Sequence, residues 1–402
     1  MALGELKLFS GRLAERGITA ATEIQTRVIP ALLAGKNVLF RSPTGTGKTF
    51  AYLLPLLQRW LPVLPENQKT IAAAYGTQAQ LLIVAPTQEL CSQIKGELDF
   101  LLGAYSKEKI PRAALISGSV NIERQIQLLK KVKPQIIVGN PARLLLCARM
   151  GRLRLHDIKA LVLDEGDALV ADEILEETKS LLHLLPKKNR QNVICSATLS
   201  ARNKERLFDC LGGIDMLGGE IVVIETEGLS VCNTIEHWAF FSERRKKIAL
   251  LRSFLAAAKP KKTLIFTARG GEAGNILSQL QYHHFSAGGI WSDISKIARK
   301  AAMDGFRAGE LSILVASDLA CRGLDIQGIS HVIALDIPDN AELYLHRSGR
   351  TGRTGRRGIM VSIGDGPELR ILSRIEKKLG IIIYPKALYG GKVLAADSTE
   401  FD

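Results

Sequence analysis

The sequence lacks the features that mark membrane, secreted and zinc-bound proteins. It contains no run of about 18 or more apolar residues, and its first residues, MALGELKLFSGRLAERG, hold no short apolar core followed by a cleavage site. Its six cysteines never form a CxxC pair and never stand beside histidines at zinc-ligand spacing. The sequence therefore predicts a soluble, unsecreted protein whose cysteines are free thiols in a reducing compartment.

Acidic residues are the scarcer charged class, with 40 Asp and Glu against 54 Lys and Arg and a formal net charge of +14. This surplus favours a polyanionic partner such as nucleic acid, although charge alone fits an anionic membrane surface equally well. The sequence also lacks low-complexity tracts. Its content of 46% hydrophobic and 23% charged residues is typical of a folded protein. A length of 402 residues exceeds one ordinary core and predicts two domains.

Short apolar runs rich in strand-forming residues alternate with segments of helical spacing. They extend from KNVLF to NVICSAT in the first half, and the pattern restarts with HWAFFS. Such alternation predicts the α/β fold class, with two domains in series that each contain a mostly parallel sheet flanked by helices. The predicted parts are a first domain 1–225, a linker 226–235, a second domain 236–386 and a short tail 387–402. The run 64–78 is predicted to be a surface loop.

The stretch RSPTGTGKTF follows the predicted strand NVLF and precedes a helical segment. Bare glycines let backbone amides approach phosphate oxygens, and the start of a helix favours an anion. Lys48 is expected to reach the terminal phosphates and Thr49 to place its hydroxyl on Mg²⁺. The predicted nucleotide-binding residues of this loop are Ser42, Thr44, Gly45, Thr46, Gly47, Lys48 and Thr49.

One position departs from the general phosphate-loop pattern, because Ser42 stands where the first glycine of GxxxxGK[ST] is expected. The alternative is a glycine-rich strand-to-helix turn with an incidental lysine. The strand before the loop and the helix after it favour the phosphate loop.

Three carboxylates end another apolar run, ALVLDEGD. Asp164, Glu165 and Asp167 would repel one another unless they faced a cation or lay in a solvated turn that caps a helix. Paired with the phosphate loop, they predict metal-assisted nucleotide hydrolysis. Asp164 is expected to hold Mg²⁺, and Glu165 to orient or deprotonate the attacking water.

A series of motifs resembles the DEAD-box ATP-dependent RNA helicase family of superfamily 2, with DEGD in place of DEAD. In chain order these motifs are TEIQ, SPTGTGKT, PTQEL, NPARL, DEGD, SAT, LIFTA, SDLACRGLDI and HRSGRTGR. The resemblance runs from about residue 8 to residue 384. It implies two tandem RecA-like domains, RNA-stimulated ATP hydrolysis, and ATP and Mg²⁺ as cofactors.

The resemblance also implies roles for individual residues. Gln25, with Thr22 and Phe9, would recognise adenine. Asp167 would connect the acids to Ser196 and Thr198 of SAT and to His346. From the second domain, Asp325 would touch the ribose, and Arg350 and Arg353 would contact the γ-phosphate. The implied catalytic set is Lys48, Glu165, His346, Arg350 and Arg353.

The RNA-contact motifs are less regular. The positions at which the family holds the sugar-phosphate backbone are Pro86, Thr87, Gly118, Pro141, Arg143, Arg299, Ser317 and Arg322. Departures from the family pattern include Gln88 for the usual arginine and Lys296 for the usual glutamine. They favour one alternative to a helicase, an ATP-gated RNA clamp or assembly factor with little unwinding activity. A DNA-directed superfamily 2 translocase is a weaker alternative, since TEIQ, DEGD and HRSGRTGR together resemble the RNA branch.

The function expected from the resemblance is ATP hydrolysis on RNA-driven domain closure, with local, non-processive unwinding of short RNA duplexes or remodelling of RNA–protein complexes. The expected partner is RNA, bound through its backbone with little sequence specificity. Ribonucleoprotein or ribosome-assembly partners, no membrane and a monomeric state are predicted as well. The predicted location is the cytoplasm, with an organelle matrix or the nucleus as alternatives for a processed or trimmed chain.

Overall fold

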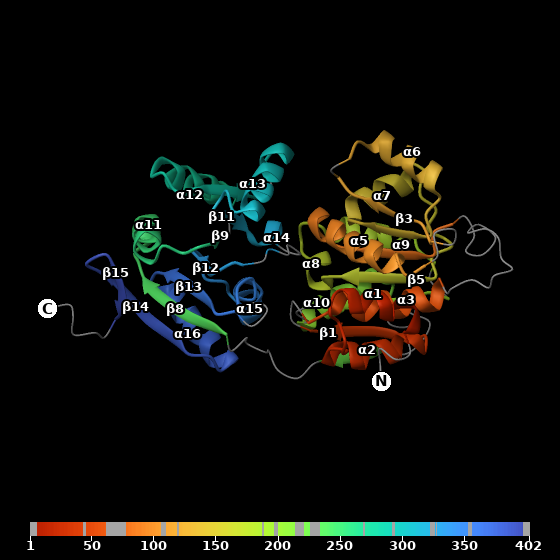
Figure 1. Ribbon diagram of the computed structural model, residues 1–402, viewed down its shortest axis with the longest axis horizontal. Helices are drawn as coiled ribbons and strands as arrows, with labels where there is room; N and C mark the ends of the chain where they lie inside the picture. The colour runs from red at the N-terminus through yellow and green to blue at the C-terminus, as the bar shows by residue number, and fades with distance from the viewer. Residues whose placement is uncertain are drawn as a thin grey trace. The chain divides into compact units, whose positions relative to one another are not determined.

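Two mostly parallel sheets, each in its own unit, form the framework of the chain (Figure 1). The computed structural model describes residues 6–42, 46–61, 78–105, 110–118, 120–186, 189–196, 200–213, 221–225, 234–267, 270–291, 294–321, 326, 328–352 and 356–396. The internal contacts divide the chain into units Met1–Glu227 and Gly228–Asp402. The predicted loop 64–78 and linker 226–235 lie mostly outside the described residues.

The first unit contains a seven-stranded sheet in the order β3-β4-β2-β5-β6-β1-β7, with every strand pair parallel. Its strands are β1 Asn37–Arg41, β2 Leu81–Val84, β3 Ala113–Ile116, β4 Ile136–Gly139, β5 Ala160–Asp164, β6 Gln191–Ser196 and β7 Ile221–Glu225. The middle strands are buried along their whole length, as expected for a sheet that is covered on both faces. Their apolar runs are therefore continuous and do not alternate with polar residues.

Helices pack on both faces of this sheet, which explains two separate hydrophobic clusters. One cluster joins the sheet to α2, α3 and α5, and the other joins it to α7, α9 and α10. The helices are η1 Lys7–Phe9, α1 Ser10–Glu15, α2 Glu23–Leu33, α3 Lys48–Trp60, α5 Gln88–Leu102, α6 Ile122–Val132, α7 Pro141–Arg149, α8 Gly166–Leu169, α9 Leu175–His183 and α10 Ala201–Cys210. The first domain is thus a three-layer α/β structure.

The second unit repeats this architecture with an eight-stranded sheet in the order β10-β11-β9-β12-β13-β8-β14-β15. Its strands are β8 Ile235–Phe241, β9 Thr263–Thr267, β10 Ala287–Ile290, β11 Ile313–Ser317, β12 His331–Ala334, β13 Gly358–Gly364, β14 Ile383–Tyr389 and β15 Lys392–Ala395. Its helices are η3 Arg244–Lys246, α11 Lys247–Ala258, α12 Gly270–Tyr282, α13 Lys296–Ala308, α14 Asp318–Cys321, α15 Ala341–Ser348 and α16 Gly366–Leu379. Among the strands described in this unit, only β14 and β15 pair in antiparallel fashion.

The predicted fold class is confirmed, but two parts of the second sheet were not predicted. One is β10, whose sequence AGGI has little strand propensity. The other is the hairpin β14–β15, so the predicted end of the second domain at residue 386 falls inside a strand. Gly390 and Gly391 join these strands with φ of 55° and 75°, which is the two-residue turn that a Gly-Gly pair favours. Among the described residues, no helix has the length and apolarity needed to cross a membrane.

Candidate nucleotide and RNA site

The predicted phosphate loop begins where β1 ends, beside the end of β6. Ser42 N–H donates to the Ser196 carbonyl at 3.2 Å, so the start of the loop is tied to the neighbouring strand. Pro43, Thr44 and Gly45 lie outside the described residues. Gly47 then takes a left-handed conformation with φ of 86° and caps α3, whose first residue is Lys48. The loop therefore leads from a strand end to a helix start, as a phosphate-binding loop requires.

The TEIQ segment contacts this loop directly. Thr22 and Gln25 form a capping box at the start of α2, and Gln25 Nε2 donates to the Gly47 carbonyl at 3.1 Å. A Cβ atom at Gly47 would lie 2.4 Å from Gln25 Nε2. Glycine is required here for its backbone conformation and for this close approach. The structure thus brings together the predicted adenine-recognition pair and the phosphate loop.

The side chains of the loop contact one another. Lys48 Nζ donates to the Ser42 carbonyl at 2.9 Å, and the hydroxyls of Ser42 and Thr46 lie 2.7 Å apart. These contacts hold the ammonium group at the start of the loop. A carbonyl is a neutral acceptor, so phosphate oxygens would bind this ammonium group more strongly.

Asp164 is the most constrained acid of the predicted site. The residue is only 5% exposed, and its carboxylate accepts hydrogen bonds from the Tyr52 hydroxyl at 2.8 Å, the Cys195 thiol at 2.8 Å and the Glu165 amide at 2.9 Å. No ion pair reaches it within the part of the chain that is described. Burial, and after it the charge of Asp164, raises the pKa of both Tyr52 and Cys195, so both remain protonated donors.

Tyr52 and Cys195 were not identified from the sequence. Tyr52 lies four residues after Lys48 on α3, and this spacing puts both side chains on one face of the helix. That spacing was the available signal for Tyr52. Cys195 precedes SAT on β6, and its neighbour in the sheet register is Asp164 itself. The contact between Cys195 and Asp164 becomes evident only once the order of the strands in the sheet is known.

The residues after Asp164 form a short, unusual turn. Glu165 has φ of 51° and ψ of 55°, a left-handed conformation that is uncommon for a residue with a side chain and is frequent at functional sites. Ser196 Oγ donates to Asp167 Oδ1 at 2.6 Å and accepts from the Asp167 amide at 3.3 Å. The contact of Asp167 with SAT that the resemblance implies is therefore present at Ser196, while Thr198 lies outside the described residues.

The donor set can be tested for Mg²⁺. Nowhere in the described chain do three or more His, Cys, Asp or Glu side chains gather as a metal cage. Mg²⁺ does not need such a cage, because it is commonly held by one or two protein oxygens together with water and substrate phosphates. The buried Asp164 carboxylate, whose three hydrogen-bond donors are all neutral, fits this mode.

The predicted RNA residues of the first unit occupy the other half of the same sheet edge. Thr87 follows β2 and caps α5, accepting from the Leu90 amide at 3.2 Å. Pro141 opens α7 after β4, and Arg143 Nε donates to Gln125 Oε1 at 2.7 Å. Further predicted RNA positions on these loops are Pro86, which precedes Thr87, and Gly118, which follows β3. The predicted residues divide this edge: those predicted to bind RNA follow β3, β4 and β2, and those predicted to bind ATP follow β5, β6 and β1.

In the second unit, predicted RNA residues gather around the end of β11. Ser317 ends this strand, and its buried hydroxyl has no hydrogen-bond partner in the described structure. Arg299, on α13, donates through Nη2 to the Ala320 carbonyl at 3.3 Å, which brings it to the adjacent helix α14. Arg322 lies outside the described residues.

The segment with the predicted arginine fingers is anchored by a residue that the sequence analysis missed. Arg347, only 2% exposed, makes a bidentate contact with Asp318 at 2.7 and 2.6 Å. The Arg350 amide donates to the Arg347 carbonyl at 3.1 Å, and the Arg350 residue is buried. His346 is half-buried on α15. Arg353 and Asp325 lie outside the described residues.

Phe9 does not lie where the predicted adenine contact needs it. Its ring is fully buried in the core of the first unit and meets the edge of Tyr105 at a centroid distance of 6.3 Å. An adenine base cannot stack on a ring that has no exposed surface. We therefore assign Phe9 a packing role and leave it out of the nucleotide site.

Comparisons with known proteins agree with this geometry. The profile of the family described as DEAD/DEAH box helicase matches residues 22–207, and that of the helicase conserved C-terminal domain matches residues 246–355. The chain is 36% identical to the DEAD-box ATP-dependent RNA helicase CshC of Bacillus cereus over 93% of this chain and 90% of that protein. It is 34% identical to the probable ATP-dependent RNA helicase YfmL of Bacillus subtilis over 94% of this chain and 93% of that protein.

A solved structure extends the likeness to three dimensions. The structure of S. cerevisiae Dbp5 bound to RNA and ADP BeF3 is similar with a TM-score of 0.80, at 25% identity, over 95% of each chain. Fold and site together define a protein of two tandem RecA-like domains with a phosphate loop in the first. The chain belongs to the DEAD-box family of ATP-dependent RNA helicases.

Proposed function

We propose that this protein is an ATP-dependent RNA helicase that hydrolyses ATP when RNA draws its two domains together. It would open short RNA duplexes locally and non-processively, or remodel RNA–protein complexes. One observation carries the ATP half of the proposal: Tyr52, on the helix that Lys48 begins, donates to Asp164 at 2.8 Å. This bond joins the phosphate-loop helix to the strand that ends in the acids.

The DEGD segment is proposed to work as a DEAD motif. Asp164 and Thr49 would hold Mg²⁺, which when bound neutralises charge on the phosphates. Glu165 would orient the attacking water and accept its proton. Gly166 in place of alanine removes only a methyl group and leaves the spacing of the three carboxylates unchanged. Ser196 would couple the conformation of this turn to the SAT motif through its hydrogen bond with Asp167.

Arginines of the second domain are proposed to complete the reaction. Arg350 and Arg353 would stabilise negative charge that develops in the transition state, and Asp325 would hold the ribose. Because the phosphate loop and the acids belong to the first domain, this arrangement would form only on closure. Hydrolysis would then depend on RNA, which binds both domains.

The RNA half of the proposal rests on the loops after β2, β3 and β4 and on the end of β11. The unpartnered Ser317 hydroxyl is a buried donor that a phosphate oxygen would satisfy. Contacts of this kind fix the strand without reading its bases. We propose in addition a monomer in the cytoplasm, with ribonucleoprotein or ribosome-assembly partners. We also propose domains 1–225 and 236–395, which places the β14–β15 hairpin inside the second domain.

Glu165→Gln tests the proposed function. We expect ATP and Mg²⁺ to bind normally while RNA-stimulated hydrolysis falls by about 10²-fold or more, because the water loses its base. The matched control is Glu173→Gln, the same change at an exposed position a few residues along the chain. Turnover in Glu165→Gln close to that of the control would contradict the assignment.

A strand-displacement assay with the unmodified chain separates the helicase from its alternatives. RNA-stimulated ATP hydrolysis together with duplex opening supports the helicase. RNA-stimulated hydrolysis without displacement would indicate the ATP-gated clamp instead. Stimulation by DNA equal to that by RNA would indicate a DNA-directed translocase.

A further inference from the structure

A cavity of about 420 Å³ lies in the second unit, apart from the residues assigned above. Its floor is the C-terminal edge of the sheet, where Thr267 ends β9, Leu335 follows β12 and Asp365 follows β13. The starts of α11 and α12 form its sides, through Lys247 and Glu272 among others. Its volume is within the range of about 300 to 1,000 Å³ that is typical of small-molecule sites.

The strand order places this cavity at a topological switch point. β9 pairs with β11 on one side and with β12 on the other. The chain adds β10 and β11 on the first side and then β12 and β13 on the second. In open α/β sheets, ligands bind outside the carboxyl ends of the strands at the point where the order reverses. The cavity therefore lies where this fold forms a crevice for a ligand.

Thr267 supplies an independent sign of a ligand. The residue is fully buried and forms part of the cavity wall, yet its hydroxyl has no hydrogen-bond partner in the described structure. Leaving a buried hydroxyl unsatisfied costs roughly 1 to 3 kcal/mol. A polar group bound in the cavity would remove that cost.

The charges of the cavity favour a cation. Four carboxylates line it, those of Glu272, Asp336, Asp365 and Glu368, against the two basic groups of Arg244 and Lys247. This local excess contrasts with the net charge of +14 for the whole chain.

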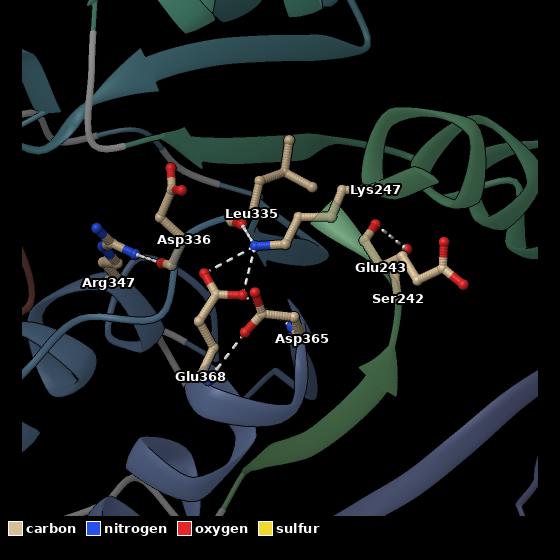
Figure 2. A network of polar contacts seen from close by, with 8 residues as sticks. All are labelled: Ser242, Glu243, Lys247, Leu335, Asp336, Arg347, Asp365 and Glu368. Atoms are coloured by element: carbon tan, nitrogen blue, oxygen red, sulfur yellow. Dashed lines mark hydrogen bonds and ion pairs between the residues drawn. The ribbon is translucent and has the colours of Figure 1, made fainter. Parts of the chain in front are cut away.

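The contacts among the residues that line the cavity show which of these charged groups already have a partner. Lys247 Nζ lies 2.7 Å from Glu368 Oε2 and donates to the Leu335 carbonyl at 2.6 Å (Figure 2). Asp365 caps α16 by accepting from the Glu368 amide at 3.1 Å (Figure 2). Glu272, half-buried at the start of α12, takes part in no ion pair in the described structure. Its carboxylate can therefore balance the charge of a bound cation.

We propose that this cavity binds an organic cation, an ammonium or guanidinium group on a short aliphatic stem. Glu272 balances its charge, and the Thr267 hydroxyl accepts one of its hydrogen bonds. Ile248, Ile276 and Pro367 cover the stem. A bound metal ion is not expected, because the described residues hold no cluster of metal-ligating side chains. The cation is either a free polyamine or a Lys or Arg side chain of a peptide, and neither source depends on the proposed ATPase site.

Isothermal titration calorimetry on the full chain, without ATP or RNA, tests this proposal. Spermidine is one probe, and an acetylated, amidated Gly-Arg-Gly peptide is the other. We expect saturable binding of at least one probe to a single site, weakened about tenfold or more in Glu272→Gln because a charge-assisted hydrogen bond is lost. The control is Glu243→Gln, which removes the same charge from a nearby side chain that is 63% exposed and does not line the cavity. Whichever probe binds identifies the source of the cation.

Thr267→Val distinguishes binding from folding. This variant should bind the probe several-fold more weakly, while its melting temperature should not fall, since no hydrogen bond is removed from the folded protein. Three results would overturn the proposal. They are no saturable binding of either probe, equal binding by Glu272→Gln and the parent, and binding of pyrophosphate that Arg244→Ala abolishes.

Discussion

Asp164 in the first unit and Glu368 in the second are both carboxylates at the C-terminal edge of a parallel sheet, but among the described residues only Glu368 forms an ion pair. Asp164 is 5% exposed and receives its hydrogen bonds from a phenol, a thiol and an amide, all of them neutral. Glu368 forms an ion pair with Lys247, whose side chain is only 9% exposed (Figure 2). The carboxylate at the first edge is therefore held by neutral hydrogen-bond donors, and the one at the second edge by an ion pair.

We propose that this difference separates a functional acid, Asp164, from a structural one, Glu368. Neutral donors orient a carboxylate and leave its charge available to a cation from outside, at the expense of folding stability. An internal ion pair cancels the charge and joins two elements, here the start of α11 and the first turn of α16. The expected consequences are loss of chemistry at the first edge and loss of stability at the second.

The largest expected effect is at the first edge, in Lys48→Ala. We expect ATP turnover to fall by about 10³-fold, equivalent to about 4 kcal/mol of barrier, because the transferred phosphate loses a point charge. Lys36→Ala, at an exposed position before β1, is the matched control. Stability should be unchanged in both variants. Turnover within about threefold of the parent would mean that the loop does not bind phosphate as proposed.

Lys247→Met probes the second edge and should lower stability while leaving ATP turnover unchanged. Removing one partner of a buried pair leaves an uncompensated charge, and we expect the second unit to lose about 3 kcal/mol of unfolding free energy. Hydrogen exchange of the β13 amides measures this unit separately from the first. The double variant Lys247→Met, Glu368→Gln should recover part of the loss. No loss in the single variant would show that the pair does not stabilise the edge.

Tyr52→Phe tests whether the neutral donors at Asp164 serve the metal. Losing one hydrogen bond to a charged group should raise the Mg²⁺ concentration for half-maximal ATP hydrolysis by about tenfold. The control is Tyr105→Phe, which removes another buried hydroxyl of the same unit, one that donates to the Leu61 carbonyl at 2.7 Å. Equal Mg²⁺ dependence in both variants would assign Tyr52 a purely structural role.

Gly166→Ala should have the smallest effect. The φ of Gly166 is not among the positive values, so alanine is compatible with its backbone. An added Cβ would lie 3.1 Å from Ile194 Cγ2 and 3.4 Å from Leu207 Cδ1, a tight but adjustable fit. We expect a stability change within about 1 kcal/mol, measured by thermal melting, and an ATPase rate within a few-fold of the parent. Large losses of both would show that the DEGD turn differs from a DEAD turn, and the roles of its acids would have to be reassigned.

Local sequence was sufficient for the parts of the site that are contiguous in the chain. The phosphate loop, the capping box of Thr22 and Gln25 and the acids after β5 are short segments whose residue types specify their own backbone. Most strands were likewise evident, because a strand buried on both faces is a continuous apolar run. The hairpin β14–β15 had a local signal as well, Gly390-Gly391, which the sequence analysis did not use.

β10 shows where local reasoning fails. Gly288 and Gly289 weaken any prediction of a strand, yet the packing of their neighbours favours glycine at both positions. A Cβ at Gly288 would lie 2.7 Å from Leu311 Cδ1, and one at Gly289 would lie 2.3 Å from the Trp291 ring. A side chain at either position would require these neighbours to shift, so the packing around this strand favours glycine. No propensity scale contains that requirement, because it arises from packing.

The sequence by itself determined the fold class, the phosphate loop, the acid turn and the order of the helicase motifs, since each is encoded by neighbouring residues whose preferences agree. Tertiary structure alone decided which side chains meet at Asp164, because Tyr52 and Cys195 come from a helix and a strand that are distant in sequence. It also buried Phe9 in the core of the first unit and formed the cavity beside Thr267. Contacts of this kind depend on strand order and packing, and these are fixed only when distant segments bury their apolar faces together.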